Sequence, residues 1–368
     1  MNRLVLIGNG FDLAHGFKTS YQDFINWYWD ERLHNIILVH EATSADILCS
    51  LEVLPESEFK DWYSLAYHYS FFKNPSRTEW AITGKEFIEF LKSEPNRFKV
   101  TYSPFFERII KSIETKNWVD IENEYYELLV LLHSHVKDNY LNLNKQMDFL
   151  RDKLIEYLKT TSIQGITPLK PIKDKIYGPI KTQEIAIENL NYSGNKIGNV
   201  TPTHIMLLSF NYTKTPELYM SNELDITINY IHGCLDEPKS VIFGYGDELD
   251  ERYHKLSNQK DNEALRHIKS IRYLESDRYR KVLQFIESGP FQIVIMGHSC
   301  GNSDRTLLNT LFEHKNCVSI KPYYHQINKD EDNYIEIVQN ISRNFKDMKL
   351  MRDRVVNKVY CEPLTTGS

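Results

Sequence analysis

The sequence lacks any apolar run that approaches the roughly 18 residues of a membrane-spanning helix. Its first apolar stretch, residues 4–7, ends at Gly8 and is too short for the hydrophobic region of a signal peptide. The five cysteines are scattered and form no CxxC pair, which argues against a disulfide framework and against a zinc knuckle. We therefore expect a cytoplasmic protein without a membrane partner and without a resident metal.

Basic residues are fewer than acidic ones, since 44 Lys and Arg against 50 Asp and Glu give a formal net charge of −6. This balance argues against nonspecific nucleic-acid binding through a generally basic surface, although a local basic groove is compatible with it. Aromatic residues are plentiful instead, with 23 Tyr, 18 Phe and 5 Trp. A chain of 368 residues is long enough for one elaborated domain or two compact ones.

Short apolar runs that stop at small or polar residues are typical of strands covered on both faces. Such runs lie at 4–7, 205–208, 226–231, 241–243, 293–296, 317–323 and 355–361. Helical patterns separate the later runs, and strands that alternate with helices form parallel sheets. We predict an α/β fold with a Rossmann-like, mostly parallel sheet, built from residues 1–20 and 200–368.

The segment between the first strand and the others has a different character. From residue 21 to about 160 nearly all signals are helical, and segments 120–132 and 142–158 carry apolar residues at helical spacing. Between 161 and 199, prolines and glycines mark turns. The sequence therefore predicts a large helical insertion over 21–199, whose last part, 161–199, is an irregular connector.

Small, polar or titratable residues follow four of the predicted strands directly. The carboxyl ends of parallel strands meet at one edge of a sheet, and ligands of open α/β sheets bind there. The residues that we expect at this edge are Gly8, Asn9, Gly10, Asp12, Ser209, Asn211, His232, Gly297, His298, Ser299 and Asp304. Their convergence predicts a shared site for a nucleotide-type small molecule.

Each of these residues also has a purely structural interpretation. Gly8 and Gly10 either let the backbone approach a phosphate or make a tight turn, with Asp12 as a helix cap. Asn211 can cap a helix, and His232 can be a hydrogen-bonded core histidine. Both interpretations stay open at this stage, because the case for a site depends on the predicted fold.

Two other enzyme classes also fit parts of the sequence. The run 297–301 matches the G-x-S-x-G elbow of serine hydrolases, with Ser299 as the nucleophile. Its triad would need a later acid and histidine, and only His314 and His325 follow. A metal-dependent phosphoesterase or nuclease is the other class, with ligands drawn from Asp12, His232, His298 and Asp304. No adjacent pair among these has a diagnostic spacing.

Several segments resemble the AbiH family of bacterial abortive-infection proteins. They are LVLIGNGFDLAHGFKTSYQDF at 4–24, WVDIE at 118–122, LLSFNYT at 207–213, IHG at 231–233 and IMGHSCGNSD at 295–304. The resemblance implies phage defence that shuts down or kills the infected cell, with a phage-derived trigger. It also implies a role in the site for Glu122, which otherwise reads as part of a solvated helix face.

The order of these motifs is similar to that of sirtuin-like domains, several of which cleave NAD in defence systems. By this similarity Asn211 positions the ribose or a water, and His232 is the general base at the N-glycosidic bond of NAD. Asn9 and residues 11–12 depart from the glycine turn of sirtuins, and the sequence has no zinc ribbon, which argues against a deacetylase.

We therefore expect an effector that cleaves NAD or a related nucleotide and requires no cofactor. The non-enzymatic alternative is a nucleotide sensor whose insertion binds a phage or host partner. The sequence leaves the oligomeric state open, including a homo-oligomer.

Overall fold

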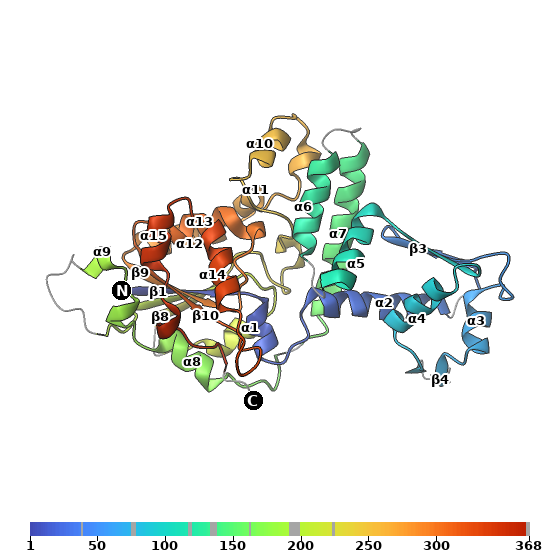
Figure 1. Ribbon diagram of the computed structural model, residues 1–368, viewed down its shortest axis with the longest axis horizontal. Coiled ribbons are helices and arrows are strands. Elements are labelled where there is room, and N and C mark those ends of the chain that lie inside the picture. The colour runs from blue at the N-terminus through green and yellow to red at the C-terminus, as the bar shows by residue number, and fades with distance from the viewer. Residues whose placement is uncertain are drawn as a thin grey trace. The chain divides into compact units, whose positions relative to one another are not determined.

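The computed structural model describes residues 1–37, 40–74, 79–116, 120–132, 138–161, 163–190, 199–222 and 225–365. The chain divides into two compact units, one of Met1–Thr19 with Leu158–Ser368 and one of Ser20–Tyr157 (Figure 1). The inserted unit thus ends at Tyr157, whereas the sequence analysis extended the insertion to residue 199. The reason is that residues of 170–190 pack against the sheet of the first unit.

A five-stranded parallel sheet in the order β10-β9-β1-β7-β8 forms the centre of the first unit. Its strands are β1 (Asn2–Ile7), β7 (His204–Ser209), β8 (Asp225–Tyr230), β9 (Phe291–Met296) and β10 (Cys317–Tyr323). Counted by their order in the chain, these strands lie in the sequence 3-2-1-4-5 that characterises Rossmann-like folds. The predicted α/β, Rossmann-like sheet is confirmed, with β1 as its middle strand.

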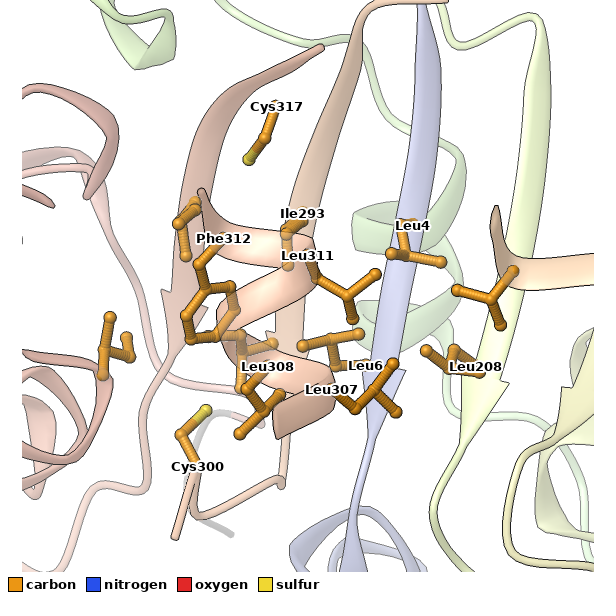
Figure 2. Close-up of a cluster of buried hydrophobic side chains, with 14 of the residues drawn as sticks. Leu4, Leu6, Leu208, Ile293, Cys300, Leu307, Leu308, Leu311, Phe312 and Cys317 are labelled. Atoms are coloured by element: carbon orange, nitrogen blue, oxygen red, sulfur yellow. The ribbon is translucent and has the colours of Figure 1, made fainter. Parts of the chain in front are cut away.

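Helices cover both faces of this sheet. The helices of the first unit are α1 (Asn9–Ala14), α8 (Lys170–Tyr177), α9 (Ile187–Leu190), α10 (Glu251–Ser257), α11 (Lys269–Arg272), α12 (Arg278–Glu287), α13 (Arg305–Phe312), α14 (Tyr334–Arg343) and α15 (Met348–Arg354). Leu4 and Leu6 point to one face, where leucines of α13 pack on them (Figure 2), and buried residues of α12 and α14 belong to the same cluster. Val5 and Ile7 point to the other face and pack with residues of α1 and α8. Successive side chains of a strand alternate between the faces, which gives three layers.

The second unit combines helices with short antiparallel strands. Its helices are α2 (Tyr21–Ile37), α3 (Trp62–His68), α4 (Gly84–Ser93), α5 (Pro104–Lys116), α6 (Ile121–Leu132) and α7 (Asp138–Leu158). Its strands are β2 (Thr43–Ala45), β3 (Cys49–Val53), β4 (Phe72–Asn74), β5 (Glu79–Trp80) and β6 (Phe98–Tyr102). They form a β2-β3-β6 sheet and a separate β4-β5 pair. The sequence predicts a helical insertion, whereas the structure has short strands in it as well.

Two predicted strands are wrong. Residues 241–243 are buried but form no strand, and the amide of Ile242 instead donates to the carbonyl of His232 in the turn after β8. Residues 355–361 make one isolated bridge, between Val355 and Ile320, and then turn into a 3-10 helix, Lys358–Tyr360. Among the described helices, none is both long and apolar enough to cross a membrane.

The middle strand yields a prediction about stability. Leu6 of β1 is fully buried beneath the helices of one face. Leu6→Ala therefore leaves a cavity and is expected to lower the free energy of unfolding by about 2–5 kcal/mol. Leu13, on α1, is 45% exposed, and Leu13→Ala is expected to change the free energy of unfolding by no more than about 0.5 kcal/mol. Urea denaturation of both variants measures the difference, and equal effects would contradict the assigned core.

Candidate functional site

Two turns at the carboxyl ends of β1 and β9 touch backbone to backbone. The amide of Gly10 donates to the carbonyl of Gly297 at 2.9 Å, and the amide of Phe11 donates to Gly8 at 2.9 Å. A Cβ on Gly8 would lie 2.5 Å from the Cα of His298, and one on Gly297 would lie 2.1 Å from the nitrogen of Phe11. The glycines thus allow close packing of the turns, and the amides of Gly10 and Phe11 already have acceptors. This geometry supports the tight-turn interpretation over a phosphate cradle.

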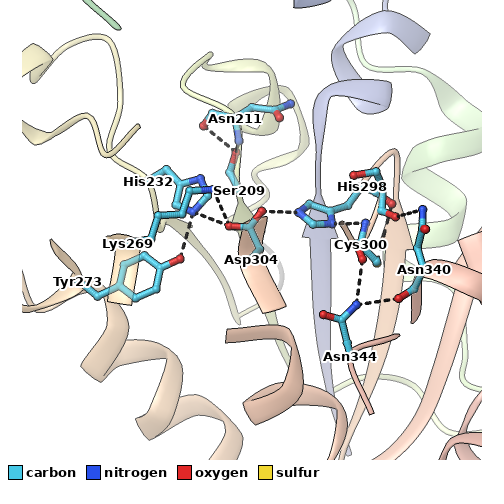
Figure 3. A network of polar contacts seen from close by, with 11 residues as sticks. Ser209, Asn211, His232, Lys269, Tyr273, His298, Cys300, Asp304, Asn340 and Asn344 are labelled. Atoms are coloured by element: carbon cyan, nitrogen blue, oxygen red, sulfur yellow. Dashed lines mark hydrogen bonds and ion pairs between the residues drawn. The ribbon is translucent and has the colours of Figure 1, made fainter. Parts of the chain in front are cut away.

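A buried carboxylate, Asp304, lies at the centre of a polar network at the same edge (Figure 3). Its Oδ1 is 2.9 Å from Nζ of Lys269 and 3.1 Å from Nε2 of His232. Its Oδ2 is 3.7 Å from Nε2 of His298. The hydroxyl of Tyr273 lies 3.1 Å from Nε2 of His232. The network joins the turns after β8 and β9 to α11, to the 3-10 helix Tyr273–Glu275 and to the 3-10 helix Asn302–Asp304.

Hydrogen bonds fix the orientation of both imidazoles. The amide of Cys300 donates to Nδ1 of His298 at 3.0 Å, so the ring hydrogen of His298 is on Nε2, which faces Asp304. Ionised Asp304 can only accept hydrogen bonds, so a neutral His232 must also present its hydrogen on Nε2. Nδ1 of His232 is then left as an acceptor. Phe210 packs against both rings, with centroid distances of 4.1 Å to His298 and 5.3 Å to His232.

Burial and charge set the protonation states in this network. Burial lowers the pKa of His232, the ammonium of Lys269 lowers it further, and the carboxylate of Asp304 opposes them only in part. Burial alone would raise the pKa of Asp304, but Lys269 and the imidazoles outweigh it and hold that pKa well below its ordinary value. At neutral pH the network therefore contains a neutral His232 beside an ionised Asp304–Lys269 pair.

Asn211 and Asp12 tie the turns after β1 and β7 together. Nδ2 of Asn211 donates to the carbonyl of Gly8 at 3.0 Å, and its amide donates to Oγ of Ser209 at 3.2 Å. Oδ2 of Asp12 accepts a 2.6 Å bond from Oγ1 of Thr213, whereas its buried Oδ1 has no partner among the described residues. Burial raises the pKa of Asp12, against the hydrogen bond from Thr213. Neither Asn211 nor Asp12 is a helix cap, although α1 does contain Asp12.

A cavity of about 260 Å³ opens beside these residues. Its lining is Phe17, Lys159, Thr161, Ile163, Thr213, Lys214, Thr215, Leu235 and Asp236. Most of these residues follow the carboxyl ends of β1, β7 and β8, which places the cavity at the predicted edge of the sheet. It is lined neither by His232 nor by Asp304, so the cavity and the titratable network are neighbouring parts of the edge and not one pocket.

The structure does not support a nucleophile elbow at Ser299. In the run 297–301 the positive φ angles belong to Gly297 and Cys300, not to Ser299. His314 packs against Phe291 at the start of β9 and pairs with Glu287, so it lies at the opposite end of the strand from Ser299. His325 is exposed beyond β10. Neither histidine is thus placed as the base that the serine-hydrolase alternative requires.

The proposed metal ligands are only partly brought together. His232, His298 and Asp304 meet, but the cation that faces Asp304 is the ammonium of Lys269. Asp12 is bonded to Thr213 instead. No group of three or more His, Cys, Asp and Glu side chains has the arrangement of a metal site within the part of the chain that is described.

Three of the remaining predicted residues have simple surroundings. Oδ1 of Asn9 accepts a 2.6 Å bond from Thr19, which fastens the end of the glycine turn. Ser299 is exposed, and its carbonyl accepts from Nδ2 of Asn340 at 2.9 Å. Glu122 is buried near the start of α6 in the second unit, so its contribution to the site stays a prediction. Trp118, from the same motif, lies outside the described residues.

Sequence reasoning missed Lys269 and Tyr273. Both lie in a stretch without a strand or a recognisable motif, in and just after the short helix α11. The sequence offers little signal for Lys269 beyond the apolar Ile268 before it, and its burial shows only in the structure, where a buried lysine requires an anionic partner.

The Lys269–Asp304 pair leads to a stability prediction. Lys269→Met keeps the side-chain length but leaves the Asp304 carboxylate buried without its ammonium, so we expect the free energy of unfolding to fall by about 3–5 kcal/mol. Lys281→Met removes an exposed lysine paired with Asp277 and should cost no more than about 1 kcal/mol. Chemical denaturation of the two variants tests this, and a Lys269 variant as stable as the Lys281 variant would show that the buried pair is not formed.

A pH dependence follows from His232. Its pKa in the folded protein lies below the roughly 6.5 of an unfolded chain, so between these values the unfolded state binds more protons. The contribution of His232 to stability is then present above about pH 6.5 and is lost as the pH falls below it. The difference in unfolding free energy between the wild type and His232→Gln should therefore shrink from about pH 8 to about pH 5. A difference that stays constant across this range would contradict the assigned buried, neutral state.

Comparisons with known proteins agree with the motifs at this edge. The chain matches the family model described as Bacteriophage abortive infection AbiH over residues 4–326. This range includes most of β1, both glycine turns, His232 and Asp304. The search of curated proteins finds no match. The resemblance seen in the sequence is thereby confirmed, and the chain belongs to the bacteriophage abortive infection AbiH family.

Proposed function

We propose that this AbiH-family chain is an anti-phage effector that acts in the cytoplasm by hydrolysing the N-glycosidic bond of NAD or a related nucleotide. The observation that carries the proposal is a neutral, buried histidine, His232, held by an ionised carboxylate at the carboxyl edge of a Rossmann-like sheet. Family membership supports abortive infection, and the chemistry is inferred from this histidine and its surroundings.

The arrangement of His232 suits a general base. With its hydrogen on Nε2 toward Asp304, the ring keeps Nδ1 to accept a proton from water. Asp304 would stabilise the imidazolium that forms, while Lys269 keeps Asp304 ionised before the proton arrives. Loss of nicotinamide passes through a cation-like sugar, and a buried, water-poor site protects such a species from side reactions.

Asn211 is suited to position the substrate. Its Nδ2 donates a hydrogen bond to the carbonyl of Gly8, which fixes the orientation of the side chain and therefore of Oδ1. Among the described residues no hydrogen bond reaches this Oδ1, so it can accept one from a ribose hydroxyl or from the attacking water. Asn211 is 9% exposed, so part of the residue remains accessible at this edge.

The neighbouring cavity fits part of a nucleotide. Its volume of about 260 Å³ lies just below that of small-molecule sites, which span about 300–1,000 Å³, so it is large enough for only part of a nucleotide. Its lining combines Phe17 and Leu235 with the hydroxyls of Thr161, Thr213 and Thr215. Apolar walls with a few hydroxyls suit a nucleoside. We infer that this cavity takes one nucleoside half of the ligand and that the scissile bond lies toward His232.

Nicotinamide release from NAD is the direct test. Purified protein is incubated with NAD, with and without phage lysate as trigger, and nicotinamide is quantified. His232→Gln should lower turnover by about 10²–10⁴-fold, the usual contribution of a general base. His204→Gln is the matched control, because His204 is an exposed histidine paired with Asp225 at the opposite end of the sheet. That variant should turn over as the wild type does.

The outcomes separate the alternatives. Absence of turnover under every trigger, or equal turnover in both histidine variants, would contradict the glycohydrolase proposal. Saturable NAD binding without turnover would instead support a nucleotide sensor. Covalent labelling of Ser299 by a fluorophosphonate would restore the serine-hydrolase alternative despite the geometry of its turn.

A further inference from the structure

A second, larger cavity of about 450 Å³ lies beside α8 and β10 in the first unit. Its lining is Arg3, Lys170, Pro171, Asp174, Lys175, Gly178, Pro179, Lys181, Glu184, Lys321, Tyr323 and Glu362. None of these residues takes part in the network around Asp304. The cavity is therefore separate from the candidate site at the carboxyl edge.

A row of buried polar side chains runs across the sheet to this cavity. Arg3 of β1 and Ser319 of β10 both lie opposite Gln292 of β9 in the strand register. Nε2 of Gln292 donates to Glu184 at 2.9 Å and to Ser319 at 3.2 Å. Nζ of Lys321 donates to the other oxygen of Glu184 at 2.8 Å. The buried carboxylate of Glu184 is thus already taken by Lys321 and Gln292.

Arg3 is the unusual member of this row, because its buried guanidinium has only uncharged partners. Nε and Nη2 donate to Oε1 of Gln292 at 3.2 and 2.9 Å. Nη1 donates to the carbonyls of Lys175, Ile176 and Gly178 at 3.1, 2.8 and 2.6 Å. Arg3 forms no ion pair with any residue that the structure describes. The charge of Glu184 favours the charged form of Arg3 but reaches it only through Gln292, and that carboxylate already pairs with Lys321. A buried charge without a direct counter-charge is costly, so a further anion nearby would stabilise Arg3.

Two lysines extend this positive region over a single aromatic ring. Nζ of Lys175 and Nζ of Lys321 lie 5.6 and 5.3 Å from the ring centroid of Tyr323. Nζ of Lys175 donates to the carbonyl of Leu364, again an uncharged partner. Burial lowers the pKa of Lys175, Glu362 opposes this, and the charge of Lys321 adds to it. Lys175 is thus held near another cation without a carboxylate of its own.

The cavity as a whole carries five cationic side chains and three carboxylates, in a chain whose net charge is −6. Of these cations only Lys321 pairs with a carboxylate within the described residues. We propose that this cavity binds the phosphate group of a small molecule, held by Lys175 with Lys170 and Lys181 at the rim. Ammonium groups and a nearby guanidinium are the usual partners of phosphate oxygens.

The test measures the affinity of inorganic phosphate, pyrophosphate and AMP by calorimetry at physiological ionic strength, with sulfate as a reference anion. Pyrophosphate tighter than AMP would point to free phosphates, and the reverse order to a nucleotide. Lys175→Gln and Lys181→Gln should each weaken the best ligand by about tenfold, because each removes a charge-assisted bond. Asp174→Asn should strengthen binding, since it removes a carboxylate from the lining.

The controls keep this test independent of the proposed glycohydrolase. Lys281→Gln removes an exposed lysine that lies outside the cavity and should leave the affinity unchanged. His232→Gln should also bind the phosphates normally, even if it no longer hydrolyses NAD. Lack of saturable binding up to millimolar concentrations would overturn the proposal. If the Lys175 and Lys281 variants weaken phosphate binding equally, or if sulfate binds as tightly as the phosphates, the binding is nonspecific electrostatic attraction and the proposed site is wrong.

Discussion

The ion pair between Asp304 and Lys269 is the interaction on which the rest of the candidate site depends. Both groups are buried, and each would be costly there without the other. Asp304 also holds His232 and approaches His298, so one carboxylate orients the turns that follow β8 and β9. Burial and the charge of Lys269 keep His232 neutral, and the same ammonium keeps Asp304 ionised.

The packing of the sheet makes this arrangement possible. Aliphatic layers on both faces exclude water from most of the strands, so the polar network of the candidate site lies where the strands end. At the carboxyl edge, the contact between Gly8, Gly10 and Gly297 brings the turns of β1 and β9 together without a side chain between them. The row from Arg3 to Lys321 is the exception to the apolar faces, and it ends in the second cavity.

The sheet could be predicted from the sequence because its strands are short apolar runs, and five of the seven runs became parallel strands. The convergence of Asn211, His232 and Asp304 followed from that topology. Lys269 could not be found this way, because a single lysine in an irregular segment belongs to no hydrophobic periodicity and to no motif. The strands of the insertion were missed since β3 and β6 alternate apolar and polar residues over only five positions each, among strong helical signals.

The position of β1 in the middle of the sheet has a consequence for biosynthesis. Its neighbours β7 and β9 follow it by roughly 200 and 290 residues in the chain. At synthesis rates of about 5–20 residues per second, β1 leaves the ribosome about 10–40 seconds before its first partner exists. The inserted unit has its own core and is complete in the chain before β7. Because His232 follows β8 and its partner Asp304 follows β9, this pair cannot form until residue 304 of the 368 has been translated.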